Sequence, residues 1–309
     1  MRTRILSVLL AATALASAET TFQGQKRDTE SVAFSPDGRL VAAGNSDNTM
    51  MIWDVASQQV VATLNGFGGT KGNAIAFSAD GKRVAAPGDT YNSVQIWDVN
   101  TGKVTAMLKG HGAKVLSVWM SPDGKTLASV SNDYALKLWN LADGKEIATP
   151  LGRSYLTESA AFSADGSKVA IGHTDGTVET YLLKDKRKGP SWKAGEGPVR
   201  AMAFSPDGAS IAAATSDNML KLYDAATGKE RLQVAASEVN TVAFSPNGKL
   251  LAVGGQDELV RLLQVSDGQP VGTPMKGHER PVRAVVFSPD GATIASGGMD
   301  HTTRLWSVR

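Results

Sequence analysis

The chain has 309 residues, of which 32 are basic and 30 are acidic, so its formal net charge is +2. Cysteine is absent, which excludes disulfides, thiolate nucleophiles, haem attachment through Cys-x-x-Cys-His and zinc ribbons. A nearly neutral chain is a poor candidate for nucleic-acid binding, because that binding rests on neutralising phosphates.

The first residues have the three-part pattern of a secretory signal peptide. Arg2 and Arg4 precede a mostly apolar stretch, Ile5 to Ala16, and Ala16-Ser17-Ala18 offers small residues for cleavage before Glu19. The stretch is shorter than the roughly 20 apolar residues of a membrane span. We therefore predict a signal peptide at 1–18, a mature domain at 19–309 and a secreted or periplasmic location. The alternative is a helical tail on a cytosolic protein.

One phrase, Phe-Ser-Pro-Asp-Gly, recurs with small variations seven times along the chain. Its serines stand 43, 43, 42, 42, 40 and 43 residues apart, at Ser35, Ser78, Ser121, Ser163, Ser205, Ser245 and Ser288. A Trp, Tyr or Leu closes each unit, at Trp53, Trp97, Trp139, Tyr181, Tyr223, Leu263 and Trp306. A period of about 40 to 45 residues that ends in Trp-Asp is typical of a propeller blade.

The third unit shows how one repeat becomes four strands. Val115 to Met120 alternates and stops at the Ser-Pro-Asp-Gly turn, where Pro presets φ and Gly suits the fourth turn position. Strands are predicted at Thr126 to Ser131, Ala135 to Asn140 and Glu146 to Leu151. One such sheet cannot bury both faces alone, so the units must stack around a channel.

The last unit stops at its third strand, Thr303 to Val308. The missing outer strand is predicted at the start of the mature chain, because Thr20 to Gly24 matches the outer strands of the first two units. The sequence thus predicts an all-β, seven-bladed propeller of four-stranded antiparallel blades. Its ring is closed by the N-terminal strand, which covers an otherwise open edge.

These residues resemble the WD-repeat (WD40) β-propeller family, from Thr20 to Arg309. Two units carry the hydrogen-bonded tetrad of that family, which the family buries within a blade. The two sets are His111, Ser129, Asp133 and Trp139, and His278, Ser296, Asp300 and Trp306. The resemblance implies a structural role for both.

A converging Ser, His and Asp also suggests a hydrolase triad, which needs an exposed nucleophile beside an oxyanion hole. The serines lie mid-strand in an alternating pattern, so we assign no catalytic residue and predict no enzyme activity. No cofactor motif is present. His173 and His301 are the two other histidines, both expected at turns, and no metal site is predicted.

The resemblance places partner binding on the rim around the channel. One rim position lies five residues before each phrase serine, a second lies two residues earlier, and a third precedes the turn aspartate. The rim residues selected are Glu30, Asn73, Lys114, Leu116, Glu158, Arg200, Asn240 and Arg283. The alternative is an ordinary solvated channel mouth. Trp119 stands where the other units have Ala or Val, and a packing substitution is favoured there over a ligand platform.

Two classes of function remain. The favoured one is a non-enzymatic protein-interaction scaffold, an exported monomer that binds a protein or peptide on the rim. The alternative is an exported propeller enzyme or small-ligand binder that uses the channel mouth. Fold alone does not decide between them.

Overall fold

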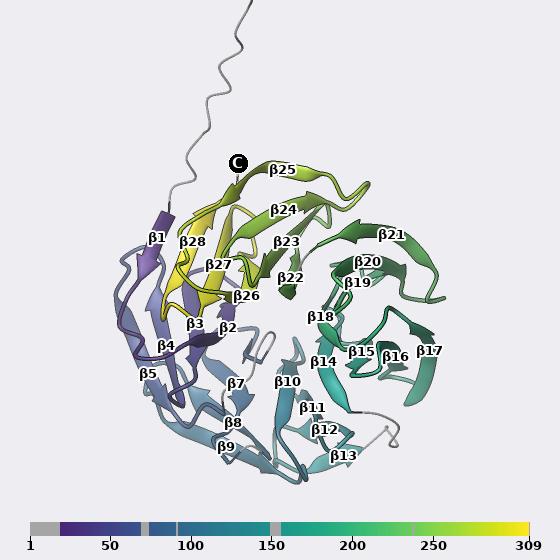
Figure 1. Ribbon diagram of the computed structural model, residues 1–309. Coiled ribbons are helices and arrows are strands. Elements are labelled where there is room, and N and C mark those ends of the chain that lie inside the picture. Colours follow the sequence, from purple (N-terminus) through teal and green to yellow (C-terminus); the bar gives the residue numbers. More distant parts are fainter. Residues whose placement is uncertain (1–18, 69–73, 91, 149–155, 237, 309) are drawn as a thin grey trace, which may run out of the picture.

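Twenty-eight β-strands form seven four-stranded antiparallel sheets in the computed structural model, arranged as blades around a channel (Figure 1). The structure describes residues 19–68, 74–90, 92–148, 156–236 and 238–308. In six blades the four strands follow one another in the chain and are neighbours in the sheet, with the first of them nearest the channel. The predicted seven-bladed propeller is therefore confirmed.

The first three blades follow the same plan. Blade 1 comprises β2 (Thr29–Phe34), β3 (Leu40–Asn45), β4 (Thr49–Asp54) and β5 (Val60–Asn65). Blade 2 comprises β6 (Ala76–Phe77), β7 (Arg83–Pro87), β8 (Ser93–Asp98) and β9 (Val104–Lys109). Blade 3 comprises β10 (Val115–Met120), β11 (Thr126–Ser131), β12 (Leu136–Asn140) and β13 (Glu146–Ala148). The predicted outer strand of blade 3 ran to Leu151, and residues 149–155 lie outside the described residues.

The remaining blades complete the ring. Blade 4 comprises β14 (Thr157–Phe162), β15 (Lys168–His173), β16 (Thr177–Leu182) and β17 (Arg187–Lys193). Blade 5 comprises β18 (Val199–Phe204), β19 (Ser210–Thr215), β20 (Met219–Asp224) and β21 (Glu230–Ala235). Blade 6 comprises β22 (Val239–Phe244), β23 (Leu250–Gly255), β24 (Val260–Gln264) and β25 (Pro270–Met275). Blade 7 comprises β26 (Val282–Phe287), β27 (Thr293–Gly298), β28 (Thr303–Ser307) and β1 (Glu19–Phe22).

Strand β1 closes the ring as predicted, and it begins one residue before the stretch from Thr20 to Gly24 that matched the other outer strands. It pairs antiparallel with β28, with Glu19 opposite Trp306 and Phe22 opposite Thr303. Phe22 is 2% exposed, and its ring centroid lies 5.3 Å from that of Trp53 in blade 1. The strand therefore completes blade 7 and also packs against the blade that follows it in the ring.

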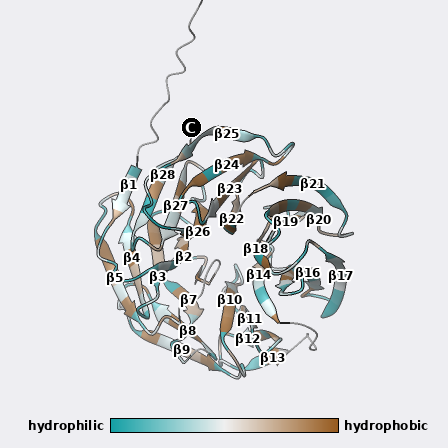
Figure 2. Ribbon diagram, viewed as in Figure 1, coloured by the Kyte–Doolittle hydropathy of each residue, from teal (hydrophilic) through white to brown (hydrophobic). Residues whose placement is uncertain are grey.

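The hydrophobic core lies between neighbouring blades, because the middle strands are covered on both faces. Every residue of β3 is buried, whereas the outer strand β5 buries only Leu64. The outer strand β17 is accordingly mostly hydrophilic (Figure 2). Small side chains fill the middle strands, and the run Ala42-Ala43 has no exposed surface. This packing needs neighbours on both sides and so favours a closed ring.

The repeated phrase is a hydrogen-bonded turn at the end of each inner strand. In blade 1 the Ser35 hydroxyl donates to Asp37 Oδ1 at 2.5 Å and accepts from the Leu40 amide at 2.9 Å. Gly38 has φ of +71°, a left-handed conformation that glycine adopts without strain. The Ser35 hydrogen bond lowers the pKa of Asp37. All seven turns repeat this arrangement and so line one end of the channel. No helix in the described part of the chain is long and apolar enough to cross a membrane.

Candidate functional site

The tetrad of blade 3 is a continuous chain of hydrogen bonds. Trp139 Nε1 donates to Ser129 Oγ at 2.8 Å, and that oxygen lies 2.7 Å from His111 Nε2. His111 Nδ1 lies 2.9 Å from Asp133 Oδ2. Burial lowers the pKa of His111, against the opposing effect of Asp133, so the imidazole is neutral. A neutral ring satisfies the whole chain when Nδ1–H donates to the aspartate and Nε2 accepts from the serine.

Blade 7 repeats the same geometry. Trp306 Nε1 donates to Ser296 Oγ at 2.7 Å, His278 Nε2 lies 2.7 Å from that oxygen, and His278 Nδ1 lies 2.9 Å from Asp300 Oδ2. Burial acts to raise the pKa of Asp300, but the hydrogen bonds that its carboxylate accepts from His278, Thr302 and the Glu279 amide act in the opposite direction, and the pKa is lowered to about 2. The carboxylate also accepts the Glu279 amide at 3.1 Å and thus holds the loop that enters the blade.

Both serines are at 0% exposure. Each already contacts an indole nitrogen and an imidazole nitrogen, so a substrate carbonyl cannot reach the oxygen. The hydrogen bonds instead tie the third strand of the blade to the second strand and to the loop before the first. This geometry is that of a structural network, not of a nucleophile beside an oxyanion hole.

The inner strands carry a β-bulge at the first rim position. In β10 the partners of Val115 and Ser117 on β11 are Ser131 and Val130, so Leu116 is the extra residue. The same shift occurs in every blade whose residue at this position is described, at Glu30, Glu158, Arg200, Asn240 and Arg283. A bulge leaves one residue outside the ladder and redirects its side chain. It explains why polar residues occupy strands whose neighbours are Val, Ala and Phe.

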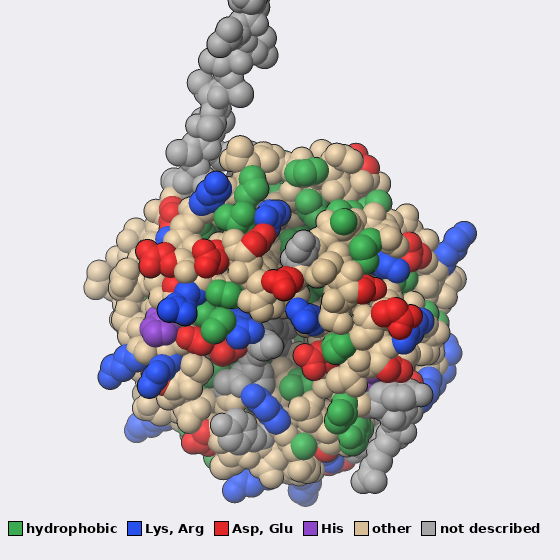
Figure 3. All heavy atoms as spheres, viewed as in Figure 1, with side chains coloured by type: hydrophobic (Ala, Val, Ile, Leu, Met, Phe, Trp, Pro, Cys, Tyr) green, Lys and Arg blue, Asp and Glu red, His purple; other side chains and the backbone are tan. Residues whose placement is uncertain are grey.

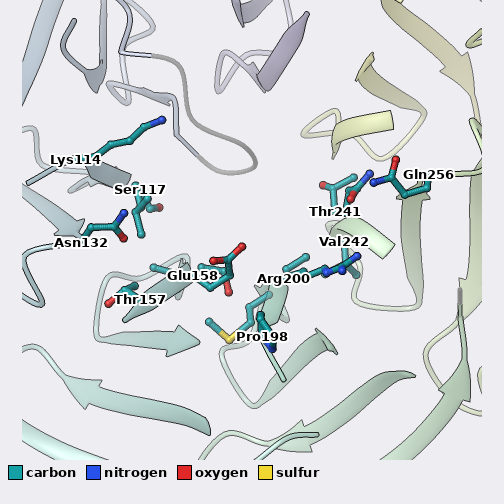
Figure 4. A pocket seen from close by; sticks show the side chains of 16 residues that line it. Lys114, Ser117, Asn132, Thr157, Glu158, Pro198, Arg200, Thr241, Val242 and Gln256 are labelled. Atoms are coloured by element: carbon teal, nitrogen blue, oxygen red, sulfur yellow. The ribbon is translucent and has the colours of Figure 1, made fainter. Parts of the chain in front are cut away.

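The bulges of blades 3 to 6 meet in a cavity of about 490 Å³ at one end of the channel. We call this cavity the polar mouth, and five predicted rim residues line it: Lys114, Leu116, Glu158, Arg200 and Asn240. Acidic and basic side chains surround the hollow in the middle of the ring (Figure 3). Glu158 on β14 and Arg200 on β18 extend into the cavity, between Lys114 and Gln256 (Figure 4). The polar mouth lies at the end of the inner strands opposite the Ser-Pro-Asp-Gly turns.

Glu158 and Arg200 are both exposed, and within the described residues neither forms a side-chain hydrogen bond or an ion pair. They come from neighbouring blades and carry opposite charges, yet no ion pair joins them. An exposed arginine that is not committed to an internal partner is available to an incoming carboxylate or carbonyl group. Among the described residues that line the polar mouth, Glu158 and Arg200 therefore have charges that are free for a ligand.

Comparison with known proteins agrees with this architecture. A family model described as the IFT122 first beta-propeller matches residues 28–273, and a model described as the WD domain, G-beta repeat, matches residues 268–307. The chain belongs to the WD-repeat β-propeller family. A search of curated proteins finds no match. The two matched ranges together run from the start of blade 1 to the end of β28, so they include both tetrads of this WD-repeat propeller.

Two of the described rim residues fall elsewhere, and a third predicted residue is not described. Glu30 and Arg283 occupy bulges but do not line the polar mouth, and Arg283 is half-buried, with its Nε atom enclosed and without a hydrogen-bond partner. Asn73 lies outside the described residues. Asn240 lines the polar mouth but is only 7% exposed, because its amide donates to the Val282 carbonyl at 3.0 Å and ties blade 6 to blade 7.

Sequence reasoning did not select several hydroxyl residues next to the bulges. Ser159 Oγ donates to the Val199 carbonyl at 2.6 Å, and Thr241 Oγ1 accepts the Val285 amide at 3.1 Å. Both line the polar mouth while they join neighbouring inner strands. In the sequence each of these residues stands four positions before the serine of the repeated Ser-Pro-Asp-Gly turn. Their hydrogen-bond partners belong to the next blade, so only the packing of two blades shows them.

The two remaining histidines belong to different blades, blade 4 and blade 7. His173 is the last residue of β15 and is buried, which corrects its predicted place in a turn; its Nε2 lies 3.5 Å from Glu179 Oε2. His301 does lie in a turn, with Nε2 at 3.1 Å from Asp28 Oδ1. Across the described ranges, no group of three or more His, Asp or Glu residues could hold a metal ion.

Proposed function

We propose that this WD-repeat protein is a non-enzymatic interaction scaffold that holds a protein or peptide segment in its polar mouth. The observation that carries the proposal is the pair Glu158 and Arg200, two exposed, unpaired and oppositely charged side chains in one cavity. Exposed charges of opposite sign that do not pair with each other are free to pair with a ligand. Arginine that loses water against a partner is a frequent hot spot of binding energy.

The lining of the polar mouth suits a polypeptide. The amide side chains of Asn132 and Gln256 line the same cavity as the two charges. Amides both donate and accept hydrogen bonds, as a peptide backbone requires. Glu158 and Arg200 would select side chains of the opposite sign, and this complementarity governs the choice of partner more than the total affinity.

The alternative, an enzyme working in this same mouth, receives no support from the lining. Glu158 is the one carboxylate among the described lining residues, and none of them is His, Cys or Tyr. General acid–base chemistry needs a proton donor and an acceptor in reach of one substrate. A single carboxylate between two cations favours recognition over proton transfer.

We further propose that the protein is exported, as a monomer, after loss of residues 1–18. The support is the basic, apolar and small-residue order of that segment. Mass spectrometry of the protein from a secreting host should find Glu19 first. An intact N-terminus at Met1 in correctly folded, cytosolic protein would refute export.

The binding proposal is tested by capture of partners from an envelope extract on the immobilised wild-type protein and on three variants. Arg200→Glu and Glu158→Arg reverse the two free charges. Lys249→Glu is the matched control, because Lys249 is exposed beside the turn of blade 6 at the opposite end of the channel. We expect one partner to be captured by the wild type and the control and to be lost from both mouth variants. A partner retained by both mouth variants, or no partner for the wild type, would count against this function.

A further inference from the structure

The channel has a second cavity at its other end, beside the Ser-Pro-Asp-Gly turns. This cavity has a volume of about 370 Å³ and is formed by the ends of β2, β6, β10, β14 and β26. We call it the apolar mouth. Its aromatic wall consists of Phe34, Phe77, Trp119, Phe162 and Phe287. No charged residue is among its described lining residues.

Trp119 makes this end of the channel unlike a regular repeat. The equivalent residues of blades 1, 2 and 7 are Ala33, Ala76 and Val286, and these also line the cavity. Three small side chains therefore leave space that faces one large indole. The space is part of the ring itself, since it depends on inner strands from five blades.

The indole of Trp119 is held in place but is not enclosed. It stacks on Phe162, with ring centroids 6.3 Å apart and an interplanar angle of 23°. A Cβ at Gly166 would stand 1.9 Å from its Cη2 atom, so the glycine of the blade 4 turn is needed for this placement. Trp119 is half-buried, and its N–H has no hydrogen-bond acceptor in the described part of the chain. The wall of the apolar mouth thus includes an indole whose N–H is not used by the described residues.

We propose that the apolar mouth binds a small neutral aromatic molecule that carries a hydrogen-bond acceptor. The ligand is neutral because an unpaired charge is costly to bury among apolar side chains. It is aromatic because rings gain from offset or edge-to-face contact with the surrounding phenylalanines and the indole. Its acceptor meets the Trp119 N–H, which can only donate. The cavity volume is at the small end of the range of about 300–1,000 Å³ for ligand pockets.

The surroundings of the apolar mouth favour a small molecule over a protein surface. The turns around it carry exposed side chains of both signs, such as Asp37 and Arg39, and Asp80 and Lys82. A protein that covered the opening would have to remove water from these charges, whereas a molecule that enters the cavity leaves them solvated.

The test uses prodan, a neutral naphthalene with a ketone acceptor, whose emission moves to the blue in an apolar site. Titration of the intact wild-type protein should give a saturable shift. Ala33→Trp, which fills the space opposite Trp119, should raise the dissociation constant at least about tenfold. Val61→Trp, which adds an indole on the exposed face of outer strand β5, is the matched control and should bind as the wild type does.

A second variant tests the hydrogen bond by itself. Trp119→Phe keeps the aromatic wall and removes the N–H, so prodan affinity should fall about twofold to tenfold, the range of one net hydrogen bond. The analogue that lacks the ketone, 2-(dimethylamino)naphthalene, should lose nothing with this variant, a difference that a purely structural role of Trp119 would not produce.

The proposal is overturned if the wild type shows no saturable shift, or if prodan binds Ala33→Trp as tightly as the wild type. Equal effects of Trp119→Phe on prodan and on the ketone-free analogue would refute the acceptor. Circular dichroism checks folding, and Val286→Phe replaces Ala33→Trp if the latter does not fold. A protein partner that competes with prodan and depends on Trp119 would also overturn the choice of a small molecule.

Discussion

Two regions of this propeller combine carboxylates with nitrogen-bearing side chains: the tetrads of blades 3 and 7, and the polar mouth. The surroundings of these side chains differ between the two regions. In a tetrad each described polar group has a partner at hydrogen-bond distance, and Ser129 and Ser296 are fully buried. In the polar mouth Glu158 and Arg200 are exposed, and neither has a partner among the described residues. Pairing and burial, and not residue type, therefore separate the groups that stabilise this propeller from those proposed to bind.

The largest loss of stability is expected when the outer strand β1 is removed from blade 7, the blade that holds one of the two tetrads. Strand β1 pairs with β28, which carries Trp306, and it buries Phe22 against Trp53. Phe22→Ala should lower the free energy of unfolding by about 3–5 kcal/mol, the usual cost of truncating a buried aromatic ring. Deletion of 19–23 should expose the edge of β28 and cause aggregation. Denaturant melts and light scattering measure the two effects.

The matched control for this prediction is another residue of an outer strand. Val61→Ala changes an exposed position of β5 and should leave stability within about 0.5 kcal/mol of the wild type. If Phe22→Ala proved as mild as Val61→Ala, ring closure by β1 would not be a source of stability.

A second prediction concerns the tetrads themselves. His111→Ala removes the partner of both Ser129 and Asp133 and should cost about 1–3 kcal/mol for each buried group left unsatisfied. His278→Ala should act in the same way in blade 7. His301→Ala is the control, because this exposed histidine pairs with Asp28 only at the surface, where such pairs contribute about 0–1 kcal/mol. Urea unfolding curves that rank the three variants equally would contradict the structural role of the tetrads.

The repeat made the fold predictable to a large extent. Seven copies of one turn predicted seven blades. The last unit ends at Val308 without a fourth strand, which predicted that the N-terminal strand pairs with β28. The tetrads were predictable because their spacing in blades 3 and 7 is identical. All of these features are local in the sequence or depend on the repeat period.

The site was less predictable because it depends on how neighbouring blades meet. Arg200 and Arg283 occupy the same position of the repeat, but the first is exposed in the polar mouth and the second is half-buried. The amide of Asn240 is used by the Val282 carbonyl of the next blade, a contact between residues 42 apart in the chain. Repeat position indicated which residues could reach the channel, but not which of them keep their polar groups free.

A third prediction uses pH to sharpen the comparison. Burial lowers the pKa of His111 below its ordinary value of 6.5, so below pH 6.5 the unfolded chain binds more protons than the folded protein and stability falls on acidification. The pKa of Asp300 is about 2, below its ordinary value of 3.8, so the folded protein loses further stability as the pH falls from 3.8 to about 2. Melting temperatures of the wild type should therefore fall from about pH 6.5 downward, and His111→Ala should flatten the first part of this fall. An unchanged slope in the variant would show that His111 is not responsible.

The smallest expected effect on stability is at the polar mouth. Arg200→Glu and Glu158→Arg change exposed side chains that have no partner within the described ranges, so the free energy of unfolding should stay within about 0.5 kcal/mol of the wild type. The double variant Glu158→Arg, Arg200→Glu keeps the net charge but exchanges the acidic and the basic position. It should be as stable as the wild type and still fail to bind a partner that recognises the arrangement of the two charges. Urea unfolding and partner capture on the same three preparations make the measurement. A loss of stability as large as that of His111→Ala would mean that these charges support the fold. If the double variant captured the partner again, the partner would respond to net charge and not to the arrangement of the two residues.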